Sequence, residues 1–307
     1  MITHYFKTLQ DTELKEITSP RNGVWTHVVA PTDEELAEII AEYGLDESIV
    51  VDITDLFEVP RMEKSGSATY FFTRYPYDEK DEDIDTAPLL IVMGESFVLT
   101  IAKREVPQFN EFIANKIAVH TTQKARFFIQ IMDVIMHSFE RELTRLRRSV
   151  QSNREGLRRI GNREIERLVN YEHELNDMIA AVVPTNAWLQ QVTTGNYMQL
   201  FANDVELMED LMIANSQLIE SSRSVLKTIQ NIRSATEAIM TNKLNATIQT
   251  LTILTIILTI PTIVASLYGM NVPLPLQEHP FAFWLVLGVI LMAVLVVITI
   301  FKRSKWL

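Results

Sequence analysis

The stretch Asn245–Asn271, NATIQTLTILTIILTIPTIVASLYGMN, decides the architecture of this 307-residue chain. Residues 245–267 contain 23 positions without a charged side chain, and 281–301 form a second uncharged run of 21 positions. About 20 apolar residues are needed to cross a bilayer as a helix. The two runs therefore predict a transmembrane hairpin within residues 245–307. The alternative is an unusually apolar helical hairpin buried inside a soluble protein.

The charged residues that flank the two runs predict their orientation. The connecting segment 268–280 has no Lys or Arg. Basic residues lie on both outer sides of the hairpin: Lys227, Arg233 and Lys243 before it, and Lys302, Arg303 and Lys305 after it. Because basic loops stay on the cytosolic side, we expect a multi-pass protein of the cell membrane with both termini cytosolic. The N-terminus has no apolar run of the kind that marks a signal peptide.

Polar residues recur at helical spacing within the first apolar run. They are Asn245, Thr252, Thr255, Thr259, Thr262 and Ser266, with Ile248 at the missing step. Polar groups in a span face protein or water rather than lipid, so the stripe indicates a pore wall. The alternative is that the hydroxyls bond back to their own helix and help the two spans to pack. One stripe cannot enclose a pore, so we expect a homo-oligomer around a common axis.

The stripe carries no charge, which suits a cation that keeps its water. Hydroxyl and amide groups hydrogen-bond a hydration shell but bind a bare ion weakly. Magnesium is the biological cation that dehydrates most reluctantly. The stripe therefore favours magnesium or a similar divalent cation as the transported ion.

The soluble part before the hairpin is acidic at its start. Residues 1–100 hold 21 Asp and Glu against 7 Lys and Arg, which disfavours nucleic acid as a partner and suits cations. The chain has no cysteine, so disulfides and thiolate metal sites are excluded. The histidines show no metal-ligand spacing, and no glycine-rich phosphate loop or nucleophile elbow is present, so we do not expect an enzyme.

The first hundred residues predict a mixed α/β domain. Val24–Val29 is typical of a buried strand, and Thr32 with Glu35 forms a capping box for a helix that ends at Gly44. Further strands are predicted at Ala68–Tyr75, Ala87–Met93 and Ser96–Ala102. An acidic turn, Tyr77–Asp85, lies between the first two of these strands.

From about Val106 the pattern is helical. Residues 125–180 carry apolar positions at helical spacing with dense charge between them, and Pro184 is expected to end this stretch. From Asn186 to Pro261 nothing stops a helix, which predicts a stalk of about 75 residues and ~110 Å. Along it runs a seam with alternating steps of three and four: Met208, Leu211, Asn215, Leu218, Ser222, Val225, Ile229, Ile232, Thr236 and Ile239. So long a helix must pack against helices of its own chain or of neighbouring copies. Together with the polar stripe, the seam supports an assembly of several copies.

The end of the first span, Tyr268-Gly269-Met270-Asn271, resembles the CorA magnesium transporter family. The signature of that family is Gly-Met-Asn at the outer end of the first of two C-terminal spans. The resemblance extends over the chain through the acidic α/β domain, Pro60-Arg61-Met62-Glu63, the charged helices, the stalk and the basic tail. It implies an α+β fold assembled as a funnel-shaped homopentamer whose first spans line the pore.

The resemblance also implies roles for particular residues. Tyr268, Gly269, Met270 and Asn271 would form the outer selectivity filter, where Asn271 binds the hydrated ion through its water. Asn245 would form an inner polar ring, Ile248 and Leu251 a hydrophobic constriction, and Thr255, Thr259 and Thr262 the rest of the wall. Thr252 and Ser266 come from the stripe only.

Regulation is implied as well. Mg²⁺ is expected both as transported ion and as regulatory ion, held between neighbouring protomers by Asp78 and Asp210 and released when the gate opens. Asp204, Glu206 and Glu209 lie near Asp210, but a solvated helix face is the simpler interpretation of these three. Tyr171-Glu172-His173-Glu174 is likewise expected to be exposed on a charged helix.

The outer loop departs from the family pattern. Many members carry Met-Pro-Glu-Leu or a more acidic segment, whereas this chain has Val272-Pro273-Leu274-Pro275-Leu276-Gln277-Glu278-His279. Cobalt and nickel therefore stay open as cargo. Two other functions also stay open: a zinc transporter of the same superfamily, proton-coupled or not, and a membrane-tethered sensor or scaffold through which no ion passes.

These patterns divide the chain into four parts. They are an acidic α/β cytosolic domain at 1–120, charged cytosolic helices at 121–184, a stalk helix at 185–244, and the transmembrane hairpin at 245–307 with its spans and basic cytosolic tail.

Overall fold

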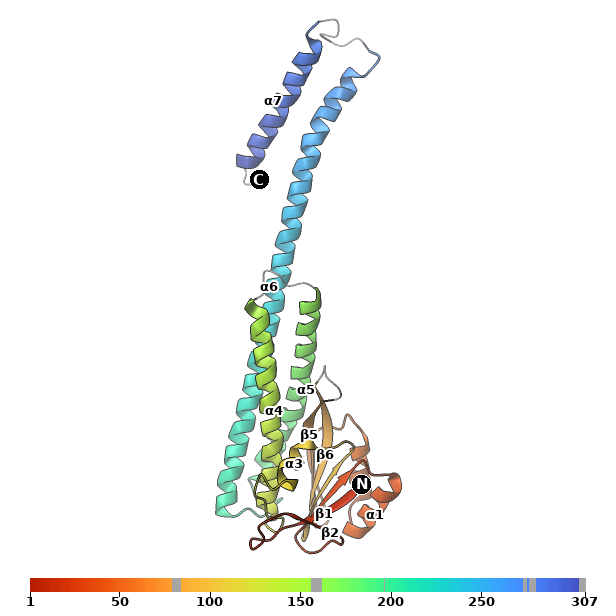
Figure 1. The fold of residues 1–307 in the computed structure, drawn as a ribbon, viewed down its shortest axis with the longest axis vertical. Helices are drawn as coiled ribbons and strands as arrows, with labels where there is room; N and C mark the ends of the chain where they lie inside the picture. The colour runs from red at the N-terminus through yellow and green to blue at the C-terminus, as the bar shows by residue number, and fades with distance from the viewer. Residues whose placement is uncertain (79–83, 156–161, 196, 273–274, 276–279, 304–307) are drawn as a thin grey trace. The chain divides into compact units, whose positions relative to one another are not determined.

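The computed structural model describes residues 1–307 except 79–83, 156–161, 196, 273–274, 276–279 and 304–307. The chain forms two compact units, Met1–Arg233 and Ser234–Leu307 (Figure 1). Helix α6 (Ala202–Tyr268) begins in the first unit and ends in the second.

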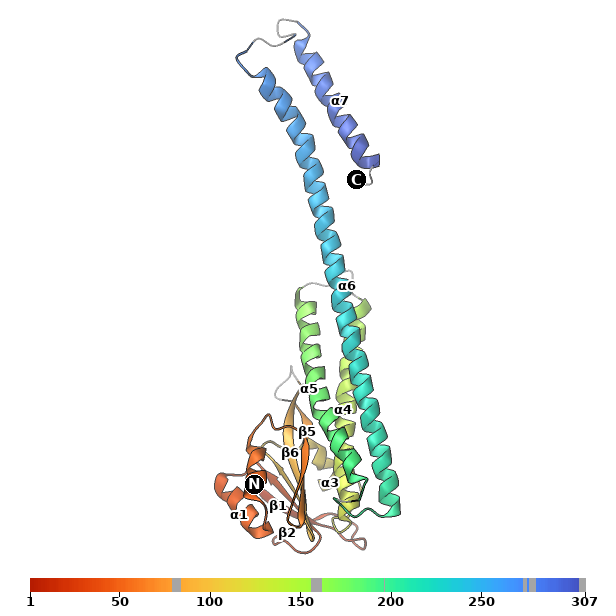
Figure 2. The same cartoon turned by 180° about the vertical axis from the view of Figure 1, so that it is seen from behind.

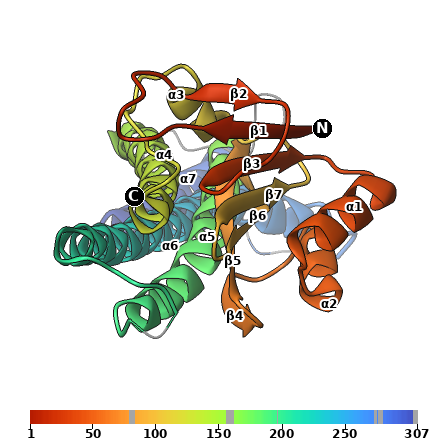
Figure 3. The same ribbon diagram turned by 90° about the horizontal axis from the view of Figure 1, so that it is seen from below.

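A seven-stranded sheet lies at the centre of the first unit (Figure 3). Its order is β2-β1-β3-β7-β6-β5-β4. The strands are β1 (Ile2–Phe6), β2 (Lys15–Ile17), β3 (Val24–Val29), β4 (Arg61–Ser65), β5 (Ala68–Asp78), β6 (Ile84–Met93) and β7 (Phe97–Ala102). The central pair, β3 and β7, is parallel, while the other neighbours pair in antiparallel fashion.

The buried central strands are the ones that the sequence pattern predicts. The strand predicted at Val24–Val29 is β3, and the other three predictions correspond to β5, β6 and β7 within a few residues. β3 and β7 are buried along almost their whole length, as continuous apolar runs in a sheet covered on both faces are. Strands β1, β2 and β4, which the sequence pattern does not predict, lie at or next to the sheet edges and are less buried.

One face of the sheet is covered by α1 (Asp33–Tyr43), α2 (Glu47–Val50) and the 3₁₀ turn η1 (Val51–Thr54). The predicted capping box is present: Thr32 Oγ1 accepts from the Glu35 amide at 3.2 Å, and Glu35 Oε2 accepts from the Thr32 amide at 3.1 Å. Gly44 ends the helix in the left-handed conformation, at φ 61° and ψ 44°. Both helix ends are therefore set by local sequence.

The other face is covered by η2 (Pro107–Phe109), α3 (Asn110–Ile113), α4 (Lys124–Glu155) and α5 (Asn162–Val192). The ring of Trp25 on β3 lies 5.5 Å from that of Phe109 and 5.1 Å from that of Phe127. The prediction of unbroken helix from Val106 onward is wrong for residues 114–123, which are irregular. Asn115 has a left-handed φ of 54°, and a helix cannot continue through that conformation.

Helices α4, α5 and the first part of α6 lie side by side (Figure 2). The seam from Met208 to Ile232 is buried in the same apolar core as residues of α4 and α5. Asn215 within it donates from Nδ2 to Asn186 Oδ1 at 3.1 Å. The seam therefore packs against helices of its own chain and is not evidence for neighbouring copies, contrary to the argument from sequence.

The expected helix break at Pro184 is also wrong, because α5 runs through this residue to Val192. A proline inside a helix removes one hydrogen bond and costs ~3 kcal/mol. Core contacts on both sides of it, by Ala181 and Val182 before and by Trp188 and Leu189 after, offset that cost. The long helix accordingly begins at Ala202 rather than near Asn186, and it continues past Pro261 to Tyr268.

The second unit contains the end of α6 and helix α7 (Ala282–Arg303). Both helices are long and apolar enough to cross a membrane, with mean hydropathies of 2.1 and 3.0 in their most apolar windows. Only 6% of the α6 window and none of the α7 window is buried by the chain itself. A core helix of a soluble protein is mostly buried, so the described residues favour membrane spans over a soluble hairpin.

Candidate ion pathway

The polar stripe lies on the part of α6 that belongs to the second unit, and the chain leaves it uncovered. Each of its members is exposed: Asn245, Thr252, Thr255, Thr259, Thr262 and Ser266. A polar row that is exposed on an apolar helix must meet water or another protein surface once it is in a bilayer.

The threonine hydroxyls of the stripe donate to their own helix. Thr252, Thr255, Thr259 and Thr262 each bond the carbonyl oxygen four residues earlier, at 2.7–2.8 Å. Thr247 and Thr250, which lie off the stripe, bond in the same way at 2.9 Å. Back-bonding, the alternative interpretation of the stripe, is therefore present. It does not distinguish stripe from non-stripe positions. It does use the hydroxyl proton, so the oxygen is left as an acceptor only.

Two large apolar side chains lie near the N-terminal end of the polar row, Ile248 at its missing step and Leu251 three residues later. Ile248 and Leu251 are 51% and 62% exposed in the single chain. Apolar side chains gathered around an axis narrow a pore and exclude water from it. Their exposure makes both available for such a constriction.

The Gly-Met-Asn segment follows directly on the end of α6. The Gly269 amide still bonds the Ala265 carbonyl at 2.9 Å, and the Met270 amide bonds that of Leu267 at 3.2 Å. A Cβ atom at Gly269 would lie 3.3 Å from the Ala265 oxygen, which is a tight contact. The φ of Gly269 is not left-handed, so neither the backbone conformation nor a contact closer than 3.3 Å requires a glycine here. Tyr268, Met270 and Asn271 are exposed. Most of the outer loop whose sequence differs from the family pattern, residues 273–274 and 276–279, lies outside the described residues.

The structure describes the two carboxylates expected to be regulatory only in part. Asp210 is exposed on α6. Asp78 is the last residue of β5, opposite Ile84, but its side chain and most of the acidic turn after it lie outside the described residues. Among the residues that the structure describes, no group of three or more His, Asp or Glu side chains could hold a metal ion. A metal site at Asp210 would therefore need ligands from elsewhere, such as a second copy.

Two expectations of solvated helix faces are wrong. Asp204 is only 6% exposed, and its Oδ2 accepts from the Phe201 amide at 3.4 Å, because it caps the start of α6. Glu174 is only 3% exposed and lies 3.5 Å from the Arg145 guanidinium of α4. Each of these buried carboxylates therefore has a partner within the chain, a backbone amide for Asp204 and a guanidinium of α4 for Glu174.

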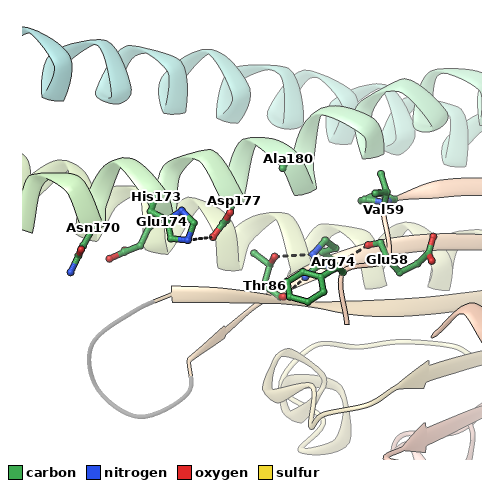
Figure 4. Close-up of a pocket in the computed structure, with 11 residues that line it drawn as sticks. Glu58, Val59, Arg74, Thr86, Asn170, His173, Glu174, Asp177 and Ala180 are labelled. Carbon is green, nitrogen blue, oxygen red and sulfur yellow. Dashed lines mark hydrogen bonds and ion pairs between the residues drawn. The ribbon is translucent and has the colours of Figure 1, made fainter. Parts of the chain in front are cut away.

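Glu174 also lines a cavity of about 480 Å³ between α5 and strands β5 and β6 (Figure 4). Arg74 is held there by the Glu58 carbonyl at 2.9 Å and by Thr86 Oγ1 at 2.8 Å. His173 and Asp177 form a pair at 3.7 Å on the α5 side. None of the residues that the sequence indicated for the ion pathway lines this cavity. The Arg74 guanidinium donates hydrogen bonds to a backbone carbonyl and a hydroxyl group, so we assign Arg74 a structural role.

These features define a class of protein: a membrane protein with a large soluble unit of sheet and helices, two apolar helices, and a polar face on the first. The comparison with protein families goes further. A model described as "CorA-like Mg2+ transporter protein" matches residues 21–303. The chain belongs to this family.

Individual relatives agree with the assignment. The chain is 26% identical over 297 residues to a cobalt/magnesium transport protein CorA of Methanocaldococcus jannaschii, covering 92% of this chain and 91% of the relative. It is 21% identical to a magnesium transport protein CorA of Campylobacter jejuni, over 94% and 92% of the two chains. The complete structure of the CorA magnesium transporter from M. jannaschii aligns over 100% of this chain and 99% of that one, with a TM-score of 0.87 at 21% identity. The whole chain therefore has the CorA fold.

Proposed function

We propose that this chain forms a divalent cation channel that mediates magnesium uptake down the electrochemical gradient. The observation that carries the proposal is the row of exposed polar side chains on an otherwise apolar membrane helix, ending at Gly269-Met270-Asn271. Several copies, five by the family resemblance, place these rows around one axis. A simple membrane anchor has no use for such a row.

The chemistry of the row fits a hydrated cation. Threonine oxygens whose protons are bonded to the helix accept hydrogen bonds, and the water molecules around a cation point their hydrogens outward. Magnesium keeps several waters and takes oxygen ligands. In this proposal Asn271 selects the hydrated ion, Tyr268, Gly269 and Met270 shape the mouth, and Ile248 and Leu251 close the pore below. Asn245 forms the inner polar ring.

The membrane potential is sufficient to drive entry. Moving one elementary charge through 100 mV is worth about 2.3 kcal/mol, so a divalent cation gains roughly 4.6 kcal/mol. No chemical energy source is needed if the interior is negative. The basic flanks of the hairpin support a plasma-membrane protein with both termini in the cytosol, which places the first unit inside the cell.

Regulation by internal magnesium belongs to the same proposal. Asp210 and Asp78 would share Mg²⁺ across neighbouring protomers and hold the pore closed, and loss of the ion would release it. The exposure of Asp210 supports this role. In the same proposal, residues 1–120 and 121–184 form the sensing part and 245–307 the pore hairpin. The stalk, expected at 185–244, corresponds to the part of α6 from Ala202 to Leu244.

The alternatives differ in measurable ways. Cobalt or nickel would pass through the same acceptor-lined path; a zinc transporter would carry zinc without magnesium; a sensor or scaffold would conduct nothing. The relative named as a cobalt/magnesium transport protein supports testing cobalt first.

Reconstitution into liposomes that contain a magnesium-sensitive dye tests the proposal. An inward gradient with a negative interior should drive magnesium entry, and Asn271→Ala should abolish it. Entry of zinc that requires a proton gradient, without magnesium entry, would identify the zinc transporter. Absence of any divalent flux from well-folded oligomers, with the inside free of metal, would favour the sensor.

A further inference from the structure

A second cavity of the first unit, of about 390 Å³, is lined by more basic than acidic side chains, which is unusual in this acidic chain. It lies where the β4–β5 hairpin, the end of β6, the start of α4 and the start of α6 meet. Lys64, Lys124 and Arg126 line it, against one carboxylate, that of Asp204. Residues 1–100, which supply nearly all of the sheet, are strongly acidic. A cavity with more basic than acidic side chains in this surrounding indicates an anionic ligand.

The basic side chains are positioned in different ways. The Lys124 ammonium donates to the Gly94 carbonyl at 2.6 Å and also to that of Glu95, which fixes its place at the cavity wall. An ammonium has three N–H groups, so one remains for a ligand. Arg126 is exposed two residues further along α4, and a guanidinium is suited to bidentate contact with phosphate.

Asp204 and Phe201 indicate which class of anionic ligand fits the cavity. A carboxylate repels a bare phosphate, but it is a suitable partner for a Mg²⁺ ion carried by phosphates, since Mg²⁺ is commonly held by one or two carboxylates together with substrate phosphates. Phe201 is 67% exposed beside it and lines the same cavity. An exposed aromatic ring offers a stacking surface for a nucleobase.

We propose that this cavity binds the magnesium complex of a nucleoside triphosphate. The phosphates contact Lys64, Lys124 and Arg126, the metal faces Asp204, and the base stacks on Phe201. Occupancy ties the first turn of α6 to the β4–β5 hairpin and to α4. The binding itself does not depend on the transport proposal.

Isothermal titration calorimetry on the full-length protein in detergent, with MgATP as the probe, tests the site. We expect saturable binding that Arg126→Ala weakens at least about tenfold, because the substitution removes charged hydrogen bonds between a guanidinium and phosphate. Arg147→Ala removes an exposed arginine from the same helix, away from the cavity, and should leave the affinity unchanged. Both variants change exposed side chains, so circular dichroism should show an intact fold.

Further arms separate the parts of the ligand. Phe201→Ala should weaken MgATP binding but not that of magnesium tripolyphosphate, and Asp204→Asn should remove the dependence on magnesium. Equal binding of tripolyphosphate and ATP would overturn the nucleotide assignment, and equal affinity with and without magnesium would overturn the role of Asp204. No binding at millimolar MgATP, or equal loss in Arg126→Ala and Arg147→Ala, would overturn the site. Magnesium flux in liposomes without nucleotide is a separate readout that these outcomes leave untouched.

Discussion

The hydroxyl of Thr259 donates a 2.7 Å hydrogen bond to the carbonyl oxygen of Thr255, one turn earlier on α6. Thr255 in turn donates to Leu251 at 2.8 Å. Both hydroxyl protons are therefore used within the helix, and both oxygens present lone pairs at its surface. A row of acceptors without net charge favours ligands that offer hydrogens, as the water shell of a cation does.

The acceptor of Thr259 predicts a mutational effect on transport. Thr259→Val keeps the shape of the side chain but removes the oxygen, so magnesium entry into liposomes should fall about fivefold or more, since one hydrogen bond contributes ~1 kcal/mol. Thr259→Ser keeps the acceptor and should retain most of the flux.

Thr250→Val is the matched control for that experiment. Thr250 also bonds back to its helix, at 2.9 Å, but it lies nine residues before Thr259, about two and a half turns, and so on the opposite side. Its loss should leave the flux unchanged. Equal losses in Thr250→Val and Thr259→Val would show that the hydroxyls act on helix structure rather than on the ion.

Asp210 predicts a change in regulation without a change in conduction. Asp210→Asn removes a charged hard-oxygen ligand, so the internal magnesium concentration that halves the flux should rise about tenfold, equivalent to ~1.4 kcal/mol. Glu209→Gln changes an exposed neighbour on the same helix and should have no effect. Unchanged inhibition in Asp210→Asn would remove this residue from the regulatory site.

His27 predicts a loss of stability in acid. Burial lowers the pKa of this imidazole from 6.5 to about 4, and its Nδ1 lies 2.9 Å from Thr100 Oγ1. Between these values the unfolded chain binds a proton that the folded one does not, so stability falls as the pH drops from about 6.5 to about 4. The full contribution is ~3 kcal/mol, at 1.36 kcal/mol per pKa unit.

The ring of Trp25 lies 5.6 Å from that of His27, so tryptophan fluorescence, to which Trp25 contributes, can follow unfolding of this core. Denaturant midpoints measured from pH 7 to pH 4.5 should fall less steeply in His27→Gln than in the native chain. His137→Gln, which replaces an exposed histidine on α4, should keep the native profile. Parallel profiles for native chain and His27→Gln would contradict the assignment.

Gly44 predicts a purely conformational cost. A Cβ at this position meets nothing within 4 Å, so Gly44→Ala should destabilise only through its left-handed backbone, by about 1 kcal/mol. Gly44→Asn should recover part of the loss, because Asn tolerates this conformation. Chemical denaturation measures both. A neutral Gly44→Ala would mean that the end of α1 rearranges.

Local signals in the sequence were sufficient for the elements that depend on a few neighbouring residues. The capping box at Thr32 and Glu35 and the stop at Gly44 are set by contacts within one turn, and β3, β5, β6 and β7 by apolar runs that need a covered sheet. Strands β1, β2 and β4 could not be predicted in this way, because partly exposed strands near a sheet edge lack a continuous apolar run. The helix break predicted at Pro184 was wrong because core packing of α5 offsets the free-energy cost of a proline inside the helix.

By itself, the sequence determined the two apolar helices, the polar row on the first and the family signature at its end, because each is a pattern along one helix and needs no partner. Only the tertiary structure decided what covers each face. It buried the seam of α6 against α4 and α5, paired Glu174 with Arg145, and brought Lys64 of β4 to one cavity with Lys124 and Arg126 of α4. Side chains far apart in the chain meet only when sheet and helices pack, and no periodicity records which of them will be neighbours.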